Sequence, residues 1–277
     1  MRRRAAHRFR HASGRRSHPV ARPLSGIVSR AAARGALRDH DSGVMPPRFS
    51  IVIPVYNEAG NLGPLLASTV TVLRTLRGEF EIIVVNDGST DRTAEEIAAA
   101  RARWPECTEL RQPGNTGQAD ALLAGLRAAR GELLITMDGD GQNDPEDIPR
   151  LLAPVEAGTL DLACGWRVDR HDSPLRRVMS RIANTVRRIV LADRVHDAGC
   201  QLRVFRREVR DALHPMELLQ SFVPALAVAA GFRVGEQPVR HHARRHGDSK
   251  YTLGRLWWRP AAAMLALRCR LWRRTPR

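Results

Sequence analysis

Four short, unbroken apolar runs recur along the chain between residues 49 and 165. Such runs are typical of strands that are buried on both faces of a sheet. Helical patterns occupy the intervals between them, and several start with Asn, Gly, Ser or Asp as candidate caps. This alternation predicts an α/β fold with a doubly wound, mostly parallel sheet. The predicted strands are FSIVIPV (49–55), FEIIVVN (80–86), ELLITM (132–137) and DLACG (161–165), and the helices lie near 60–77, 91–103, 117–130 and 145–158.

Beyond Asp169 the pattern changes to Arg-rich helical segments, with further strand candidates at QLRVF (201–205) and FRVGEQPV (232–239). The segment Leu253–Leu271 has apolar residues at helical spacing, although Pro260 would kink this helix or set its start. Its arginine and tryptophan flanks favour an amphipathic helix at a membrane surface, and packing on the domain is the alternative. The apolar face consists of Leu256, Trp257, Pro260, Met264, Leu267 and Leu271.

The net charge of +16 is concentrated at the two ends of the chain. Residues 1–44 contain eleven Arg and two Asp, and residues 233–277 contain twelve basic and two acidic residues. We expect a disordered basic tail over 1–44, one α/β domain over 45–240 and a basic segment over 241–277. Basic ends favour an anionic partner, either a membrane surface or a nucleic acid, while a merely solvated tail is the alternative.

The tail is Arg-rich and acid-poor, as transit peptides are, and a gene start placed too early, with Met45 as the initiator, is the alternative. No run approaches the roughly 18 to 20 apolar residues that a membrane-spanning helix needs, so none is expected. The four cysteines show no Cys-x-x-Cys spacing and are expected to be reduced, mostly buried thiols in a cytoplasmic protein. They are Cys107, Cys164, Cys200 and Cys269.

Polar side chains follow the first two predicted strands, where a doubly wound sheet binds its ligands. After IVIPV come Tyr56, which offers an aromatic surface to a nucleoside, and Glu58, which offers a carboxylate to ribose hydroxyls. Ordinary turn chemistry is the alternative for that segment. After FEIIVVN, Asp87 is placed to accept hydrogen bonds from a nucleobase or ribose. A plain Asp-Gly turn explains Gly88 but not an acid at the ligand edge.

The segment MDGDGQNDPEDIP after the strand at 132–137 predicts a divalent metal site. Asp138, Asp140 and Gln142 stand at alternate positions as oxygen ligands for Mg²⁺ or Mn²⁺, with substrate phosphates completing the shell. A calcium-binding loop is excluded because the twelfth position is Pro149 instead of Glu. The chain has neither Gly-x-x-x-x-Gly-Lys nor Gly-x-Gly-x-x-Gly, which argues against ATPases and nicotinamide enzymes.

Taken together, IVIPVYNE, VVNDGSTD, NTGQADAL and MDGDGQNDPED resemble the family 2 glycosyltransferases of GT-A fold. DAGCQLRVFRRE and RRHGDSKYTLGRL are similar to the branch of polyprenyl-phosphate sugar transferases that includes dolichyl-phosphate mannosyltransferase. The resemblance covers roughly residues 49–256. It implies a GT-A domain over 45–240 and inverting transfer from a UDP- or GDP-sugar to a polyprenyl phosphate. It also implies a divalent metal at the Asp-x-Asp pair.

The resemblance assigns roles by position. The nucleotide-binding positions are matched by Pro54, Tyr56, Glu58, Asp87 and Asp138, and the metal and diphosphate positions by Asp138, Asp140 and Gln142. Arg167 matches an arginine that faces the acceptor phosphate, and Arg203 matches an anion-binding position. Asp197 matches a carboxylate proposed as base or metal partner. A structural role for Asp197 beside neighbouring arginines is the alternative. The chain departs from the family where Asn86 replaces Asp and where Gly139 and Gly141 replace bulkier residues.

Arg244, Arg245 and Lys250 are further candidates for the acceptor phosphate. Lys250 is the only lysine of the chain, which favours a compact charge on phosphate, with chance as the alternative. Transfer to a polysaccharide or protein hydroxyl is a second hypothesis, with Asp197 as the general base. A non-catalytic basic protein would leave the strand-end motifs unexplained, so we expect no nucleic-acid partner and a peripheral enzyme at the cytoplasmic membrane face.

Overall fold

The computed structural model describes residues 45–168, 184–191, 193, 195–243 and 263–269. The basic tail and the acceptor candidates Arg244, Arg245 and Lys250 lie outside these residues, as does most of the predicted helix Leu253–Leu271. The chain divides into Met1–Gly43 and Val44–Arg277, and the second unit contains all the elements below.

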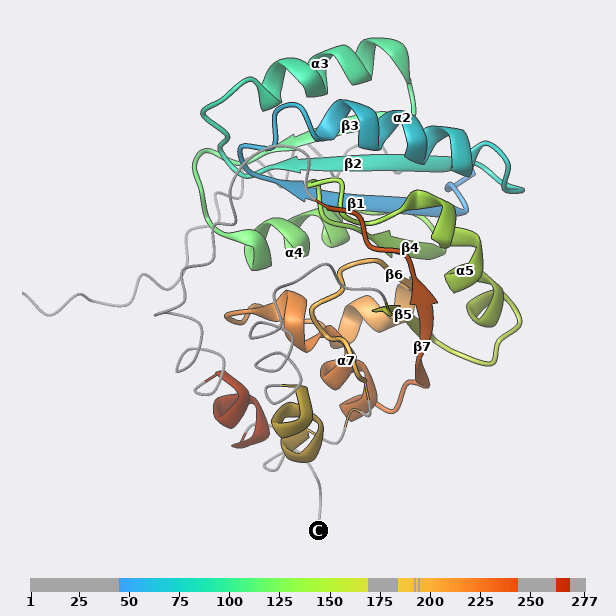
Figure 1. Cartoon of the computed structure of the whole chain (residues 1–277), viewed down its shortest axis with the longest axis vertical. Helices are drawn as coiled ribbons and strands as arrows, with labels where there is room; N and C mark the ends of the chain where they lie inside the picture. The colour runs from blue at the N-terminus through green and yellow to red at the C-terminus, as the bar shows by residue number, and fades with distance from the viewer. Residues whose placement is uncertain (1–44, 169–183, 192, 194, 244–262, 270–277) are drawn as a thin grey trace, which may run out of the picture. The chain divides into compact units, whose positions relative to one another are not determined.

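The described residues of this unit form one seven-stranded sheet in the order β3-β2-β1-β4-β6-β5-β7 (Figure 1). All neighbouring pairs are parallel except those of β6, which runs antiparallel to both β4 and β5. The expected α/β fold with a mostly parallel sheet is therefore confirmed. The strands are β1 Phe49–Val55, β2 Phe80–Asn86, β3 Cys107–Arg111, β4 Leu133–Thr136, β5 Leu162–Arg167, β6 Arg203–Arg206 and β7 Val234–Val239.

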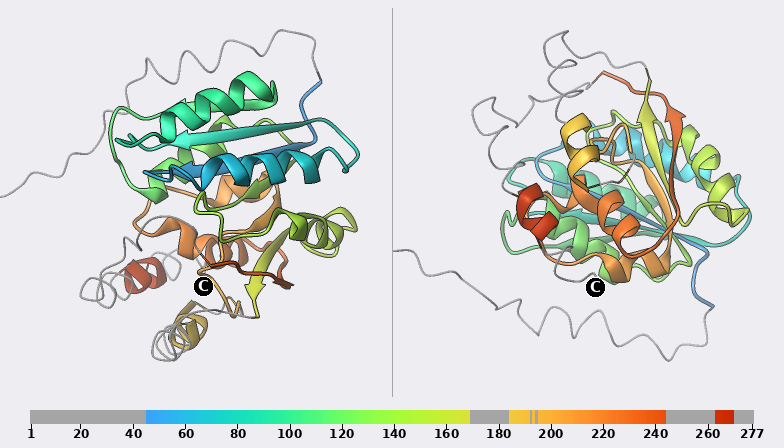
Figure 2. Two further views of the ribbon diagram at one scale, coloured as in Figure 1. Left: turned by 45° about the horizontal axis from the view of Figure 1, so that its top comes forward. Right: turned by 90° about the horizontal axis from the view of Figure 1, so that it is seen from below.

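Helices cover both faces of the sheet. Helices α2, α3 and α5 pack on one face, and α4 and α7 pack on the other (Figures 1 and 2). The α-helices are α2 Leu62–Leu73, α3 Thr93–Arg103, α4 Gln118–Ala128, α5 Ile148–Glu156 and α7 Leu219–Ala229, and the 3₁₀ helices are η1 Pro145–Asp147 and η2 Arg207–Ala212. Residues 184–191 and 263–269 are also helical.

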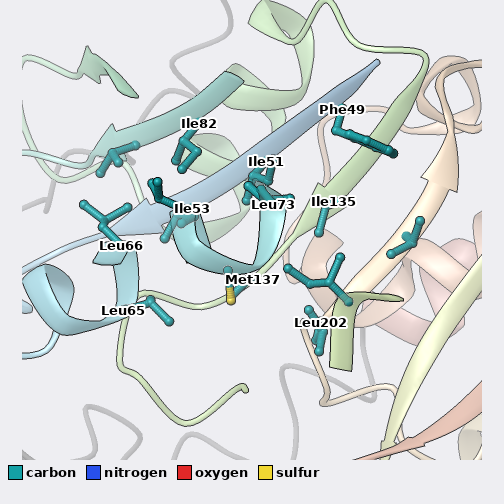
Figure 3. Packing of buried hydrophobic residues seen from close by; sticks show 14 of the residues in the cluster. Phe49, Ile51, Ile53, Leu65, Leu66, Leu73, Ile82, Ile135, Met137 and Leu202 are labelled. Carbon is teal, nitrogen blue, oxygen red and sulfur yellow. The ribbon is translucent and has the colours of Figure 1, made fainter. Parts of the chain in front are cut away.

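The apolar runs supply two hydrophobic cores because successive residues of a strand point to opposite faces. In β1, Ile51 and Ile53 belong to the core beneath α2, which contributes Leu66 and Leu73 (Figure 3). Val52 belongs to the core beneath α4 and α7. Because the positions that face either core are apolar, the sequence of such a strand is a nearly continuous apolar run and does not alternate between apolar and polar residues.

The predicted strands at 49–55 and 80–86 match β1 and β2 to the residue, whereas β3 was not predicted. Strand β3 lies at the edge of the sheet and has the sequence CTELR, in which Cys107 is buried and Thr108 is exposed. Only one of its five side chains is buried, so the strand lacks the apolar run that marks a buried strand. Helix α7 was not delimited either, because it is apolar on most sides and has no amphipathic period.

Strand β6 enters the sheet from the edge at which β4 and β5 end. Arg203, its first residue, pairs with Thr136 at the carboxyl end of β4 and with Cys164 of β5. The segment before β6 is therefore delivered to the carboxyl edge of the parallel strands, where ligands bind in sheets of this type.

Gly125→Ala should lower the free energy of unfolding by about 1–3 kcal/mol, because an added methyl group overpacks the core. A Cβ at this position of α4 would lie 2.4 Å from Val52 Cγ1 and 2.7 Å from Val85 Cγ2. Gly63→Ala in α2 is the matched control, since its new Cβ would come no closer than 3.6 Å to Glu96 Oε2. That change should be neutral or stabilise by up to about 1 kcal/mol. Urea unfolding measures both, and an equal effect at the two sites would contradict the packing argument.

Three cysteines, Cys107, Cys164 and Cys200, are buried as expected, and Cys269 is exposed. Among the helices that the structure describes, none combines the length and the apolar character that crossing a bilayer requires.

Candidate functional site

The loop after β1 is fixed to the loop after β2 by side-chain hydrogen bonds. Asn57 has a left-handed backbone with φ 53°, a conformation that Asn tolerates better than most residues. Its Oδ1 accepts a hydrogen bond of 2.7 Å from Thr90 N, and its Nδ2 donates to Thr90 Oγ1 at 3.1 Å. The backbone N–H of Glu58 donates to Thr93 Oγ1 at 2.8 Å. These contacts hold Tyr56 and Glu58, two nucleotide-binding candidates, at the end of the strand.

Asp87 joins the end of β2 to the segment that begins α4. Its Oδ1 accepts from Thr116 N at 2.7 Å and from Thr116 Oγ1 at 3.0 Å, and its Oδ2 accepts from Gly117 N at 2.9 Å. The side chain is buried. Asp87 thus orders the neighbouring loop, and its contact with a nucleotide stays a prediction. Asn86 has a similar role, since its Oδ1 caps the turn by accepting from Ser89 N at 2.9 Å.

The metal-site candidates Asp138 and Asp140 lie against the end of β1. Gly139 between them permits this approach, because a Cβ there would stand 2.4 Å from Val55 Cγ1. Gln118, the first residue of α4, donates from Nε2 to Asp138 Oδ1 at 2.7 Å. Asp140 is buried, and its Oδ1 accepts from Gln142 N at 3.1 Å. The departure at Gly139 therefore has a steric reason and removes no predicted ligand.

The carboxylates of Asp138 and Asp140 repel each other electrostatically. Burial raises the pKa of Asp138 to about 7, and the charges of Asp140 and Glu58 act in the same direction. Arg167 and Arg203 lower the pKa of Asp138 but do not cancel that rise. Two crowded carboxylates fit a hard divalent cation, which would neutralise them.

In the described ranges, no group of three or more His, Cys, Asp or Glu side chains forms a complete metal cage. A pair of carboxylates is nevertheless enough for Mg²⁺, which is commonly held by one or two carboxylates and by substrate phosphates. The donor set formed by Asp138 and Asp140 therefore fits such a cation.

Mn²⁺ affinity of the metal-free protein should fall about tenfold for each pH unit below about 7, because a carboxyl must release its proton before it binds a metal. Above that pH the carboxyl of Asp138 is ionised and the affinity should level off. Calorimetric titration between about pH 5.5 and about pH 8 measures this slope. Asp138→Asn should bind more weakly and with less pH dependence, and a slope identical to that of the wild type would contradict the assignment.

Arg167 and Asp197 form a bidentate ion pair at the end of β5. Arg167 Nε donates to Asp197 Oδ2 at 2.7 Å, and Nη2 donates to Asp197 Oδ1 at 2.8 Å. The two side chains are 14% and 5% exposed. Burial alone would lower the pKa of Arg167, but the hydrogen bonds and charge of Asp197 raise it above its ordinary value. Of the two roles predicted for Asp197, the structural partnership with an arginine has direct geometric support.

Arg203 is fully buried, whereas a residue that binds an anion directly needs an exposed guanidinium. The Arg203 guanidinium donates to Ala198 O at 2.9 Å and to Gln201 Oε1 at 3.1 Å. In this arrangement its charge reaches Asp138 electrostatically, since it lowers the pKa of that carboxyl. Direct contact between Arg203 and a phosphate stays a prediction.

The loop that carries Gln142 is bound to the residues that follow β7. Gln142 O accepts from His242 N at 2.9 Å, and His242 Nε2 lies 2.9 Å from Asp144 Oδ2. Arg240 contacts the same loop, with Nη1 3.2 Å from Asp144 Oδ2 and 2.9 Å from Glu146 Oε2. The Gln142 amide nitrogen donates to His242 O at 3.3 Å, so its ligand atom for a metal would be Oε1.

Three residues that were not predicted also lie next to the segment of the predicted metal site: Gln118, Arg240 and His242. Gln118 stands inside the motif NTGQADAL, which is itself a usable signal. Arg240 and His242 lie almost one hundred residues from their partners, and only the pairing of distant strands brings them together.

The sequence of the chain matches a known protein family. The family model described as "Glycosyl transferase family 2" matches residues 50–213. The chain is 37% identical over 225 residues to dodecaprenyl-phosphate galacturonate synthase of Rhizobium johnstonii, a match that covers 79% of this chain and 66% of that protein. It is 41% identical over 209 residues to undecaprenyl-phosphate 4-deoxy-4-formamido-L-arabinose transferase of Pseudomonas fluorescens, covering 75% of this chain and 61% of that protein. The matches thus span slightly less than two thirds of these relatives.

A solved structure of glucosyl-3-phosphoglycerate synthase from Mycobacterium tuberculosis, in complex with Mn²⁺, uridine diphosphate and glucosyl-3-phosphoglycerate, has a similar fold. The TM-score is 0.62 at 20% sequence identity, and the match covers 91% of this chain and 86% of that one. At this level of identity the similarity concerns the fold.

Proposed function

Because the chain belongs to glycosyl transferase family 2, we propose that it transfers a sugar from a UDP- or GDP-sugar to a polyprenyl phosphate, with inversion at the anomeric carbon. The observation that carries this proposal is the arrangement at the carboxyl edge of the sheet. The Asp138–Asp140 pair lies close enough to the Arg167–Asp197 pair for Arg167 to influence the pKa of Asp138. This proximity supports a site for a metal-bound diphosphate beside a site for a second anion.

In the donor half, Tyr56 and Glu58 would contact the nucleoside at the ends of β1 and β2, with Pro54 and Asp87 shaping its floor. Asp138, Asp140 and Gln142 would hold Mg²⁺ or Mn²⁺. A bound divalent cation would neutralise the leaving nucleoside diphosphate, a large electrostatic contribution in such reactions.

In the acceptor half, a lipid phosphate is already anionic near neutral pH, with a second pKa of about 6, so it needs little help from a general base. The protein must instead counter its repulsion from the donor diphosphate. Arg167 and Arg203 both lower the pKa of Asp138, so both would contribute positive charge here, Arg203 from within the protein. Arg244, Arg245 and Lys250 remain candidates for the same task. Since both oxygens of Asp197 already accept from Arg167, an acceptor that needs no base is the better fit.

Exposed apolar side chains support a peripheral membrane location, and the cytoplasmic face of the membrane is part of the same proposal. Ile189 is 76% exposed and Leu265 is 58% exposed, although other residues of the helical segments 184–191 and 263–269 pack on the core beneath α4 and α7. Apolar side chains next to arginines are typical of helices that lie at a membrane surface. The names of the two curated relatives, which contain dodecaprenyl phosphate and undecaprenyl phosphate, agree with a lipid acceptor.

A direct assay tests the proposal. Purified protein is incubated with Mn²⁺ or Mg²⁺, a panel of UDP- and GDP-sugars and a short-chain polyprenyl phosphate, and the glycolipid product is measured by mass spectrometry. A thermal-shift screen with the same nucleotides identifies the donor, because a ligand that binds only the folded state raises the melting temperature. Transfer to a polysaccharide or protein hydroxyl, but not to the lipid phosphate, would overturn the acceptor assignment. Nucleic-acid binding with steep salt dependence and no affinity for any nucleotide sugar would overturn the whole proposal.

A further inference from the structure

Glu236, in β7, uses its carboxylate to hold the turn that presents Asp197. Its Oε1 accepts from His196 N at 2.9 Å and from Asp197 N at 2.9 Å. Its Oε2 accepts from His196 N at 2.8 Å and lies 2.8 Å from His196 Nδ1. The side chain is only 10% exposed. One carboxylate thus satisfies two successive backbone N–H groups and a histidine ring.

The turn that contains His196 and Asp197 has no regular secondary structure, so its position depends on individual contacts such as those of the Glu236 carboxylate. Asp197 then holds Arg167 by two hydrogen bonds at 2.7 and 2.8 Å. Glu236 and Arg167 lie on neighbouring parallel strands, with Glu236 opposite Cys164 of β5. A continuous series of contacts therefore connects Glu236 in β7, through the backbone of the turn and the Asp197 carboxylate, to the Arg167 guanidinium at the end of β5.

His196 strengthens this arrangement. Its ring stacks on Trp166 with the ring centroids 5.4 Å apart and the planes inclined by 28°. Trp166 immediately precedes Arg167 in β5. The turn is thus held on one side by the Glu236 carboxylate and on the other by an aromatic residue of the strand that carries Arg167.

We infer that Glu236 is a positioning residue which, through the backbone of His196 and Asp197, sets the orientation of Arg167 and so the affinity for the acceptor phosphate. This inference rests on the proposed function, in which Arg167 faces that phosphate. Preorganised charged groups depend on such supporting contacts, and a displacement of about 1 Å can cost roughly a hundredfold in rate.

The decisive variant is Glu236→Gln, which keeps one oxygen to accept from the backbone but loses the charge and one of the two accepting oxygens. KM for a short-chain polyprenyl phosphate should rise about tenfold, whereas KM for the nucleotide sugar and affinity for Mn²⁺ should change less than about twofold. Glu236→Ala should give the same selective change with a larger magnitude. A merely structural role would instead lower the melting temperature and the active fraction without a selective rise in acceptor KM, and that result would overturn the inference.

Asp161→Asn is the matched control at the opposite end of the same strands. Asp161 holds Arg233 by a comparable bidentate pair, with Arg233 Nε 3.0 Å from Oδ2 and Nη2 2.8 Å from Oδ1. This pair lies far along β5 and β7 from the carboxyl edge. The control should leave both KM values unchanged, and a rise in acceptor KM equal to that of Glu236→Gln would overturn the inference.

A second readout does not depend on turnover. In protein labelled with ¹⁵N-arginine, the Nε–H signal of Arg167, assigned through its loss in Arg167→Lys, should exchange slowly with water because of the ion pair. In Glu236→Gln and Glu236→Ala that exchange should become faster. If the wild type transferred no sugar but the exchange changed as expected, the proposed function would fail while the positioning role would stand. An unchanged Arg167 signal in both variants would overturn the positioning role whatever the activity.

Discussion

Asp140→Asn should lower sugar transfer by about a hundredfold to a thousandfold, because removing one group that stabilises developing charge commonly costs that much. Asp140 is a buried carboxylate beside Asp138, and together they form the donor set that fits a divalent cation. The change keeps the shape of the side chain, and its Oδ1 can still accept from Gln142 N, so the fold should be retained. Mn²⁺ affinity measured by calorimetry should fall in parallel with the transfer rate.

Asp120→Asn is the control for this change, since Asp120 is an exposed acid in the first turn of α4. It should leave both the transfer rate and Mn²⁺ affinity unchanged. If Asp140→Asn bound Mn²⁺ and transferred sugar as the wild type does, the metal assignment would be wrong.

The second large effect is expected at the Arg167–Asp197 pair. Breaking a buried ion pair by removing one partner costs about 3–5 kcal/mol, because the other charge is left buried and uncompensated. Asp197→Ala and Arg167→Ala should each lower both the free energy of unfolding and the transfer rate. The double variant should be little worse than either single one, since the two side chains act as a unit.

A double-mutant cycle of transfer rate and urea unfolding measures this coupling. If Asp197 were instead a general base that acts independently of Arg167, Asp197→Ala would be far more damaging to kcat than Arg167→Ala, and the two effects would add. Additive losses would therefore favour a hydroxyl acceptor over a phosphate.

The parts of the fold that the sequence predicted well are those governed by local chemistry. Strands β1 and β2 carry apolar side chains on both faces, as strands covered by helices on both sides do, and this pattern can be recognised from the sequence. Strand β3 could not be predicted in the same way, because only Cys107 of its five residues is buried. Its place in the sheet is fixed by hydrogen bonds to β2, which leave no mark on side-chain polarity.

The same distinction applies to the site. Asp138 and Asp140 are two positions apart, so their proximity could be predicted from spacing. The partnership of Arg167 with Asp197 spans 30 residues, and that of Glu236 with His196 spans 40. Such contacts depend on the order of strands in the sheet, which the sequence did not specify. The buried position of Arg203 was missed for a further reason: an arginine in a short strand normally indicates an exposed face, and here its donors bond to Ala198 and Gln201 instead of water.

The reversed strand β6 gives the site its width. Neighbouring strands in a sheet lie about 4.8 Å apart, so inserting β6 between β4 and β5 holds Thr136 and Cys164, which both pair with Arg203, roughly 10 Å from each other. The loop with Asp138 follows β4, and Arg167 stands at the end of β5. In the reaction that we propose, this additional strand spacing would keep the donor diphosphate and the acceptor phosphate apart, so that the sugar could lie between them.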